Sequence, residues 1–178
     1  MEHKINLPVD KDRINSLKVG DIVYLNGTII TARDQVHKRI IEFDKQGKHL
    51  PENFYGLKGS AIYHCGPIIV NREGNYKIIS GGPTTSQRMD DLENEIIKLL
   101  NINFIIGKGG MKNLKTKKLH VAYLSYTGGC GAIINKKIKK IKAVEWKDLG
   151  LCEAAWFLEV QDFGPLIVAQ DSHGKSLY

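Results

Sequence analysis

The spacing of hydrophobic residues along the chain predicts two helices. In residues 89–100 the apolar side chains recur with a period near 3.6, and two aspartates stand in the first turn, where the helix dipole favours negative charge. Residues 34–43 have apolar side chains at 36, 40, 41 and 43, a spacing that is also helical. The periodic positions of the first segment are Met89, Leu92, Ile96, Leu99 and Leu100.

Runs of β-branched and aromatic residues predict strands, and several of them lead into glycine-rich turns. The stretch DIVYLNGTIITA (21–32) surrounds an Asn26-Gly27 pair, which favours a hairpin because both central residues of a type I′ turn need positive φ. A buried strand in residues 60–70 is interrupted at Gly66-Pro67. Further strands are predicted at 75–80, at the start of 103–111, within 119–134, and at 154–163 and 165–171.

Strands and helices are therefore mixed, which indicates an α/β or mixed α+β fold. The chain contains no internal repeat, low-complexity tract or linker rich in serine, proline or glycine. Its 178 residues suffice to bury a sizeable core, so we expect one domain over residues 1–178. The order of the strands does not follow from these patterns.

The composition is that of a globular protein, with 42% hydrophobic and 25% charged residues. No apolar run reaches the roughly 18 residues that span a bilayer, and the N-terminal segment lacks the apolar region of a signal peptide. We therefore expect a cytoplasmic protein with no membrane partner. The formal net charge of +7 by itself suits an anionic partner, whether nucleic acid, a membrane surface, an acidic protein or a small polyanionic substrate, or simply a solvated surface.

Two basic runs, KNLKTKK (112–118) and NKKIKKIK (135–142), motivate the alternative of a nucleic-acid-binding module. Such modules usually interleave aromatic residues for base stacking, and neither run contains one. We therefore interpret the runs as solvated faces, or as surfaces that meet an acidic partner, and expect no nucleic acid.

The three cysteines, Cys65, Cys130 and Cys152, are widely spaced and form no Cys-x-x-Cys pair. This spacing indicates neither a zinc ribbon nor a self-contained iron–sulfur site, and a disulfide framework is not expected in a cytosolic chain. Each cysteine is interpreted as a small buried apolar residue. No metal site is predicted.

Two glycine-rich loops have the composition of anion sites. In GGPTTSQRM (81–89) the hydroxyl residues supply donors and a helix cap, and Arg88 has a planar fork that matches a carboxylate or phosphate. GKGGM (107–111) places Lys108 between glycines, like a cation beside an anion nest. It does not match a Walker A loop, and the chain has no dinucleotide-binding fingerprint.

A third cluster, ARDQVHKR (32–39), lies at the start of a predicted helix. Arg33 would be a second carboxylate clamp, and His37 could be a proton carrier or a supporting donor. The alternative is that Asp34 only caps the helix and that His37 is half-buried on it. Three loops, each with a cation, favour a small dianion over a polymer, and two carboxylates could be held by Arg33 and Arg88.

Several motifs, in their order, resemble the β subunit, or C-terminal domain, of class I iron–sulfur fumarases and the related L-tartrate dehydratases. The matching elements cover the chain from about residue 20 to its end. The most specific are GGPTTSQRM and the Arg-Asp-x-x-His element. In order, the elements are GDIVYLNGTIITARDQVH, CGP, GGPTTSQRMD, IGKGGM, TGGCGA and LGLCEAAWFLEVQDFGPLIVAQDSHGKSLY.

The resemblance implies a swivelling β/β/α domain, similar to the mobile domain of aconitase-like hydro-lyases. It also implies a partner α subunit, in a heterodimer or heterotetramer, that carries a [4Fe–4S] cluster; the cysteines of this chain would bind none of it. The open iron would act as a Lewis acid on the substrate hydroxyl during interconversion of fumarate and L-malate. This chain would clamp the carboxylates of the small dicarboxylate substrate.

Position by position, the resemblance implies substrate-binding roles for Arg33, Arg88 and Lys108. Thr84 matches the group proposed as the catalytic base, although its weakly basic hydroxyl would need ionisation or a relay. Asp34 and His37 are expected to support the site without touching substrate. Candidates for hydroxyl or backbone contacts to substrate are Thr85, Ser86, Gly109 and Gly110.

The chain departs from the family pattern in two places. Cys130 and Gly131 stand where the family usually has alanines, and Gly164 precedes Pro165 where the family more often has phenylalanine. We expect neither change to affect the site. The chain starts at this domain, so we expect a separate subunit.

Dehydration of L(+)-tartrate stays open as the alternative reaction, since the two substrates differ by one hydroxyl that these residues do not discriminate.

Overall fold

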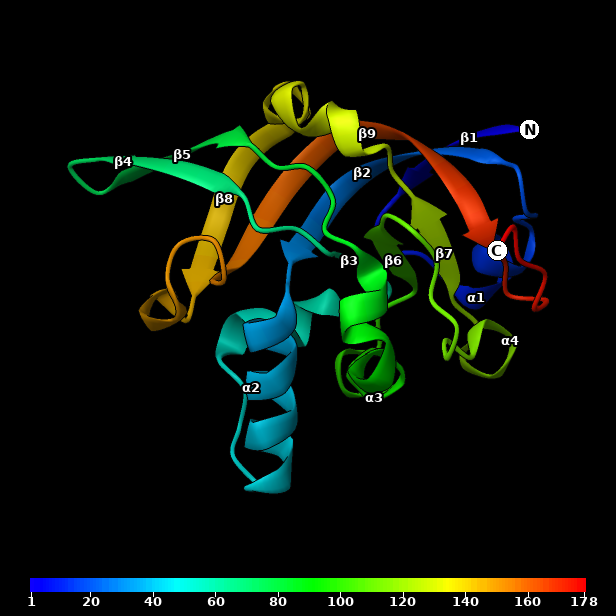
Figure 1. Ribbon diagram of the computed structural model, residues 1–178, viewed down its shortest axis with the longest axis horizontal. Helices are drawn as coiled ribbons and strands as arrows, with labels where there is room; N and C mark the ends of the chain where they lie inside the picture. The colour runs from blue at the N-terminus through cyan, green and yellow to red at the C-terminus, as the bar shows by residue number, and fades with distance from the viewer.

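The computed structural model describes residues 1–178 and has the mixed α/β class that the sequence predicts (Figure 1). The strands are β1 (Glu2–Asn6), β2 (Ile22–Thr31), β3 (Ala61–Tyr63), β4 (Ile68–Arg72), β5 (Asn75–Ser80), β6 (Phe104–Gly107), β7 (Ala122–Ser125), β8 (Ile138–Glu145) and β9 (Ala155–Gln170). The α-helices are α1 (Lys11–Asn15), α2 (Asp34–Lys45), α3 (Asp90–Leu100) and α4 (Thr116–Leu119).

Seven of the strands form one sheet that closes on itself through its two longest strands. Parallel pairings join β2, β3, β6 and β7 in that order, and β9 pairs antiparallel with both β7 and β2. The series of pairings therefore returns to β2. Outside this ring, β1 pairs with β2 and β8 pairs with β9. The remaining strands, β4 and β5, form a separate hairpin that extends away from the helices in Figure 1.

Alternating side chains of the short parallel strands fill two cores. Ala61 and Tyr63 of β3 point into one hydrophobic cluster, and Ile62 between them belongs to the other. Phe104 and Ile105 of β6 divide in the same way. The first cluster fills the interior of the closed sheet. The second lies between the sheet and the buried faces of α2 and α3, which lie together below the sheet in Figure 1.

The hairpin predicted at Asn26-Gly27 is wrong, because β2 runs straight through this pair. The register with β9 shifts there, and β2 exchanges its neighbour β1 for β3. Gly27 has a φ of 109°, and a Cβ built on it would lie 2.8 Å from the carbonyl oxygen of Leu7. The glycine therefore serves a β-bulge and a close backbone approach, two other uses of positive φ in a strand.

The two strands predicted on either side of Gly164-Pro165 are one continuous strand, β9. Phe163 pairs with Leu25 and Leu166 with Val23, with a register shift between these pairs. The proline therefore falls at an irregularity of the ladder, where its missing N–H costs no hydrogen bond.

The basic run at 135–142 contains most of a strand that the sequence pattern did not predict. In β8 the residues Ile138 and Ile141 pack against the core, and Lys139 and Lys140 are exposed. Lysines on an edge strand oppose pairing with other chains. The lysines are thus exposed, as both interpretations of the run require, and they stand on regular structure. The N-terminal strand β1 was also not predicted.

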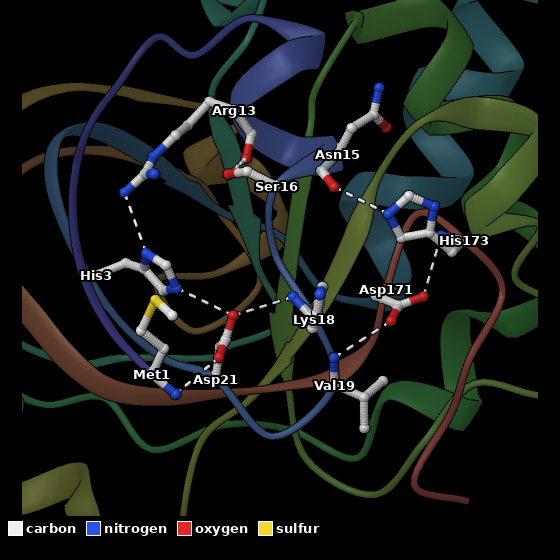
Figure 2. Close-up of polar contacts among 10 residues, drawn as sticks. All are labelled: Met1, His3, Arg13, Asn15, Ser16, Lys18, Val19, Asp21, Asp171 and His173. Carbon is white, nitrogen blue, oxygen red and sulfur yellow. Dashed lines mark hydrogen bonds and ion pairs between the residues drawn. The ribbon is translucent and has the colours of Figure 1, made fainter.

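Two aspartates anchor the segment that precedes β2, and one of them ties it to the end of the chain, as Figure 2 shows. Asp21 accepts hydrogen bonds from the Met1 amino group, the Lys18 N–H and His3 Nε2. Asp171, which directly follows β9, accepts from the N–H groups of Val19 and His173. These contacts anchor the segment that precedes β2. None of the helices is long and apolar enough to span a membrane.

Candidate anion-binding site

The loops 81–89 and 107–111 lie side by side and are joined through their backbones. Thr85 and Lys108 form a parallel bridge, in which the Ser86 N–H donates to the Lys108 carbonyl at 3.0 Å and the Lys108 N–H donates to the Thr84 carbonyl at 3.4 Å. The Thr84 N–H donates to the carbonyl of His64 at 2.6 Å. Two of the three predicted anion loops therefore converge within this chain.

The glycine-rich turn η3 (Gly128–Ala132) packs against the first of these loops. The Gly81 N–H donates to the Gly131 carbonyl at 3.1 Å, and a Cβ on Gly131 would lie 3.0 Å from the Gly82 nitrogen. A Cβ on Gly128 would lie 4.0 Å from Lys108 Nζ. Glycines on both sides let the loops approach closely and leave the Lys108 ammonium beside bare backbone.

No side chain of the loop 81–89 caps α3. A 3₁₀ turn, η2 (Ser86–Met89), leads into the helix instead and contains Arg88. In the first turn of α3, the Asp90 carboxylate accepts hydrogen bonds from the N–H groups of Lys112 and Asn113 at 3.1 Å. The start of the helix thus fixes the segment that follows Lys108, although the predicted hydroxyl cap is absent.

The two predicted arginine clamps each face an acidic side chain. Arg88 pairs with Asp34 through Nη2 and Oδ2 at 2.6 Å, and Arg33 Nε lies 3.3 Å from Glu153 Oε1. The side chain of Arg33 packs closely over Gly66, where a Cβ would overlap its guanidinium. Asp34 lies in the first turn of α2 but is not its N-cap, so the helix-cap alternative is wrong.

The predicted site residues divide into a surface set and a buried set. Lys108, Thr85 and Gly109 are exposed, and Thr84 and Gly110 are partly buried. Lys108 takes part in none of the ion pairs of the chain. Ser86 and His37 are fully buried, and His37 is therefore not half-buried as the alternative interpretation held.

Ser86 belongs to a buried hydrogen-bonded network below the loops. Its hydroxyl lies 2.9 Å from His64 Nδ1 and accepts from the Tyr123 hydroxyl, also at 2.9 Å. Glu93 Oε2 lies 2.9 Å from the Nε2 atoms of both His64 and His37. The Ser86 hydroxyl is thus hydrogen-bonded below the loop to His64 and Tyr123. It supports the loop from beneath and is not a donor at the surface.

Glu93 and His37 hold each other in their charged forms. Burial alone would raise the pKa of the Glu93 carboxyl, but the facing imidazoles of His64 and His37 outweigh it and lower the pKa to about 2. Burial likewise disfavours the imidazolium of His37, yet the Glu93 carboxylate outweighs it and raises the pKa of His37 above its ordinary value.

The sequence alone predicts no role for Glu93, His64 or Tyr123. Glu93 had a signal: it is four residues after Met89 and three before Ile96, so it shares the apolar face of the predicted helix. A charged residue in the middle of a buried face calls for a buried partner. Nothing in the pattern around His64 identifies that partner.

A cleft adjoins the two joined loops. It has a volume of about 780 Å³ and contains Thr85, Gly109 and Gly110, but Thr84, Lys108 and the two clamp arginines do not line it. Its wall contains no aspartate or glutamate side chain and five lysines: Lys112, Lys115, Lys117, Lys118 and Lys175. An anion would meet positive potential on approach to the loops from this side.

The cysteines do not gather into a ligand group. Cys65 and Cys130 are buried, as expected, and burial raises the pKa of the Cys65 thiol far above its ordinary value. Cys152 is exposed, so its interpretation as a buried residue is wrong; its backbone packs against Gly66 and its side chain faces outward. Three potential metal ligands do come together, but they are His37, His64 and Glu93.

Comparison with known proteins places these residues in a family. The family described as Fumarase C-terminus matches residues 1–178. A protein of Methanocaldococcus jannaschii named "Putative L(+)-tartrate dehydratase subunit beta" is 51% identical over 182 residues, covering 100% of this chain and 91% of the relative.

Two further relatives carry related names. The "L(+)-tartrate dehydratase subunit beta" of Escherichia coli is 37% identical over 183 residues, which cover 99% of this chain and 87% of that protein. The "Putative fumarate hydratase class I" of Geobacillus stearothermophilus is 38% identical over 178 residues. That match covers 98% of this chain but 33% of the relative, which is much longer.

Proposed function

Because the chain belongs to the fumarase C-terminal family, we propose that it is the β subunit of a hydro-lyase that interconverts fumarate and L-malate. In this proposal the chain is a cytoplasmic protein of one domain. That domain swivels against a partner α subunit in a heterodimer or heterotetramer. The observation that carries it is the position of Arg88 and Lys108 on two joined loops, with Arg33 packed beside them over Gly66.

A four-carbon dicarboxylate needs two separated cationic groups. The guanidinium of Arg88 has five N–H donors, and Asp34 occupies one edge of it. The remaining N–H groups can hold one carboxylate as a planar fork. Arg33 faces Glu153 through Nε and keeps its terminal nitrogens for the second carboxylate. Lys108 adds a point charge, and the backbone at Gly109 and Gly110 brings further N–H donors.

Thr84 is the proposed group nearest to the reacting carbon. Its N–H and its carbonyl both form backbone hydrogen bonds, with His64 and Lys108, so the backbone that carries its side chain is held in place. A threonine hydroxyl is a weak base, and proton removal by Thr84 therefore requires an ionised hydroxyl or a relay group from the partner subunit.

The residues of this chain do not fit a [4Fe–4S] cluster, since the cysteines form no ligand group. We therefore assign the cluster to the α subunit, where an open iron would supply a Lewis acid for the substrate hydroxyl. Every role proposed for this chain is binding, orientation or proton handling.

Dehydration of L(+)-tartrate is the second candidate, and the names of the relatives that are 51% and 37% identical favour it. The two substrates differ by one hydroxyl, and Thr85 is an exposed side chain of the loop that could face it. A site that hydrogen-bonds a substrate hydroxyl strongly rejects the analogue that lacks it. The two reactions are therefore separable by experiment.

The test is a turnover assay of the chain with and without a co-expressed cluster-bearing α subunit, under anaerobic conditions. Fumarate absorbance is followed after addition of L-malate, and oxaloacetate is measured after addition of L(+)-tartrate. Turnover of malate by the complex, and not by the chain without the α subunit, supports the fumarase proposal. If the complex turns over tartrate but not malate, the second candidate replaces it. A well-formed complex with neither activity would refute both.

A further inference from the structure

Beneath the joined loops, three fully buried titratable side chains meet at one oxygen atom. His37 comes from α2, Glu93 from α3, and His64 from the segment after β3. Both imidazole Nε2 atoms lie 2.9 Å from Glu93 Oε2, and the two rings pack edge to face with centroids 5.3 Å apart. The proposed catalytic chemistry uses none of these groups directly.

The hydrogen-bond partners of His37 identify where its protons lie. Nδ1 is 2.8 Å from the Arg33 carbonyl, which can only accept, so this nitrogen carries a hydrogen. Nε2 faces the Glu93 carboxyl, and one proton must lie between these two atoms. Imidazole is ordinarily the stronger base of the two by about 2 pH units, so the pair is an imidazolium and a carboxylate.

The second branch of the network is satisfied with neutral groups. The Tyr123 hydroxyl donates to Ser86 Oγ, so the Ser86 hydroxyl is free to donate to His64 Nδ1. His64 then donates from Nε2 to Glu93. Burial raises the pKa of Tyr123, which keeps it a phenol and a donor.

Each branch ends on a segment that carries a proposed site residue. His37 holds the carbonyl of Arg33, and the His64 carbonyl accepts the Thr84 N–H. Ser86 belongs to the turn that contains Arg88, and its N–H donates to the Lys108 carbonyl. The buried groups thus fix three segments, which carry Arg33, Thr84 with Arg88, and Lys108, and which are far apart in sequence but must act on one substrate.

We propose that Glu93 is a positioning residue whose carboxylate, between His37 as an imidazolium and His64 as a neutral imidazole, aligns the segments that carry Arg33, Thr84 and Arg88. This inference rests on the proposed function only for its effect on turnover. The protonation pattern and the structural coupling stand independently of which substrate is used.

The same three side chains could instead bind a divalent metal through two imidazoles and a carboxylate. The geometry favours the metal-free network, because every N–H and O–H donor in it already has an acceptor. Glu93 Oε1 alone lacks a partner. A metal would have to displace both Nε2 protons, so bound metal would be recognised by the loss of these protons.

The first measurement needs no variant. In the ¹⁵N-labelled full chain, long-range ¹H–¹⁵N correlation spectra report the protonation state of each imidazole. We expect at neutral pH one buried histidine protonated on both nitrogens and one protonated on Nε2 alone. Two neutral buried histidines, or one equivalent of bound metal that is lost in Glu93→Gln, would overturn the inference.

The second measurement is the kinetics of Glu93→Gln in the complex with the α subunit. Displacement of the clamps by a fraction of an ångström to about 1 Å should lower kcat per folded molecule on the order of a hundredfold. Glu95→Gln is the matched control, since Glu95 is exposed on the same helix and forms none of the ion pairs. An unchanged kcat in folded Glu93→Gln would refute the positioning role.

Tyr123→Phe keeps the experiment interpretable if Glu93→Gln does not fold. It removes one hydroxyl and leaves the ion pair intact. The Ser86 hydroxyl loses its donor, so we expect a kcat several-fold lower and a changed ¹⁵N pattern at His64, with that of His37 unchanged. A change at His37 instead would contradict the order of the network.

Discussion

Arg88 and Asp34 form a two-point ion pair between the loop 81–89 and the first turn of α2. Arg88 Nε lies 3.2 Å from Asp34 Oδ1, and Nη2 lies 2.6 Å from Oδ2. The Arg88 side chain is 49% exposed and that of Asp34 is 19% exposed. An ion pair this exposed contributes little to stability. What it does fix is the direction in which the guanidinium points, since a planar fork held at one edge presents the other.

We predict that Arg88→Lys in the complex with the α subunit lowers kcat/KM about a hundredfold or more for the substrate that the complex turns over. A lysine keeps the charge but cannot hold Asp34 and a substrate carboxylate with one planar group. Initial rates over a range of substrate concentrations provide the measurement.

Lys140→Ala is the matched control for this change. Lys140 is an exposed cation on β8, outside the proposed site, so its removal should leave kcat/KM within about twofold. The free energy of unfolding should change by less than about 0.5 kcal/mol in either variant. Activity of Arg88→Lys close to that of the unmodified complex would remove Arg88 from the site.

Asp34→Asn tests whether the carboxylate orients Arg88. The amide keeps the size of the side chain but loses the charge and one of the two contacts. We expect KM to rise about tenfold with a smaller change in kcat, because the guanidinium loses its fixed direction before substrate binds. The unfolding free energy should fall by less than about 1 kcal/mol. A fall in kcat at constant KM would mean that Asp34 takes part in the chemistry.

Part of this site follows from the sequence for clear physical reasons. Helix α3 was predicted from its 3.6-residue period, and the glycine loops from residue types that backbone approach requires. Within α3, however, Leu99 is 37% exposed and Ile97 is buried. Both sit at the border of the apolar face, and the packing of α3 against the sheet decides which one turns inward.

The network around Glu93 could not be assembled from the sequence, because its members are brought together by strand order. His64 follows β3, and β3 lies between β2 and β6 by pairings that no local pattern encodes. The hairpin predicted at Asn26-Gly27 and the strand break predicted at Gly164-Pro165 were wrong for a related reason. Each pair usually marks a turn, but here both lie at register shifts between β2 and β9, where a closed sheet needs its strands to bend.

Acid should destabilise the protein partly through Glu93. Its folded-state pKa of about 2 lies below the ordinary value of 4.5, so the carboxylate contributes stability that is present above pH 4.5 and lost as the pH falls toward 2. Other groups contribute to the acid limb, including Asp21, whose pKa is also about 2 because of the Met1 amino group. The difference between the unmodified chain and Glu93→Gln isolates the contribution of Glu93.

The contribution of His37 to stability has the opposite pH dependence, since it is lost as the pH rises. His37 has a raised pKa, because the Glu93 carboxylate, aided by Asp34, outweighs the burial that would lower it. Its contribution is therefore complete below pH 6.5 and is lost as the pH rises through the folded-state value. Urea unfolding from pH 3 to pH 9 should show that the stability lost in Glu93→Gln is largest between about pH 4.5 and pH 6.5 and smaller toward either end of the range. A constant difference at every pH would contradict the ion pair.

Gly107→Ala places a methyl group directly against the buried network. A Cβ on Gly107 would overlap Ser86 Oγ and lie 3.3 Å from His64 Nδ1 and 3.1 Å from the Tyr123 hydroxyl. Overpacking of this kind costs about 1–3 kcal/mol. We expect a loss of that size in the free energy of unfolding. Gly56→Ala should be close to neutral, because nothing lies within 4 Å of its Cβ position.

A double-mutant cycle identifies the cause of that loss. Ser86→Ala removes the atom that the new methyl would overlap, so the double variant Gly107→Ala/Ser86→Ala should be more stable than the sum of the single changes predicts, by about 1 kcal/mol or more. The double variant still lacks the hydroxyl between Tyr123 and His64, so kcat should stay low while stability recovers. Strict additivity of the two unfolding free energies would mean that the loop moves away from Gly107 without strain, and that the network does not set its position.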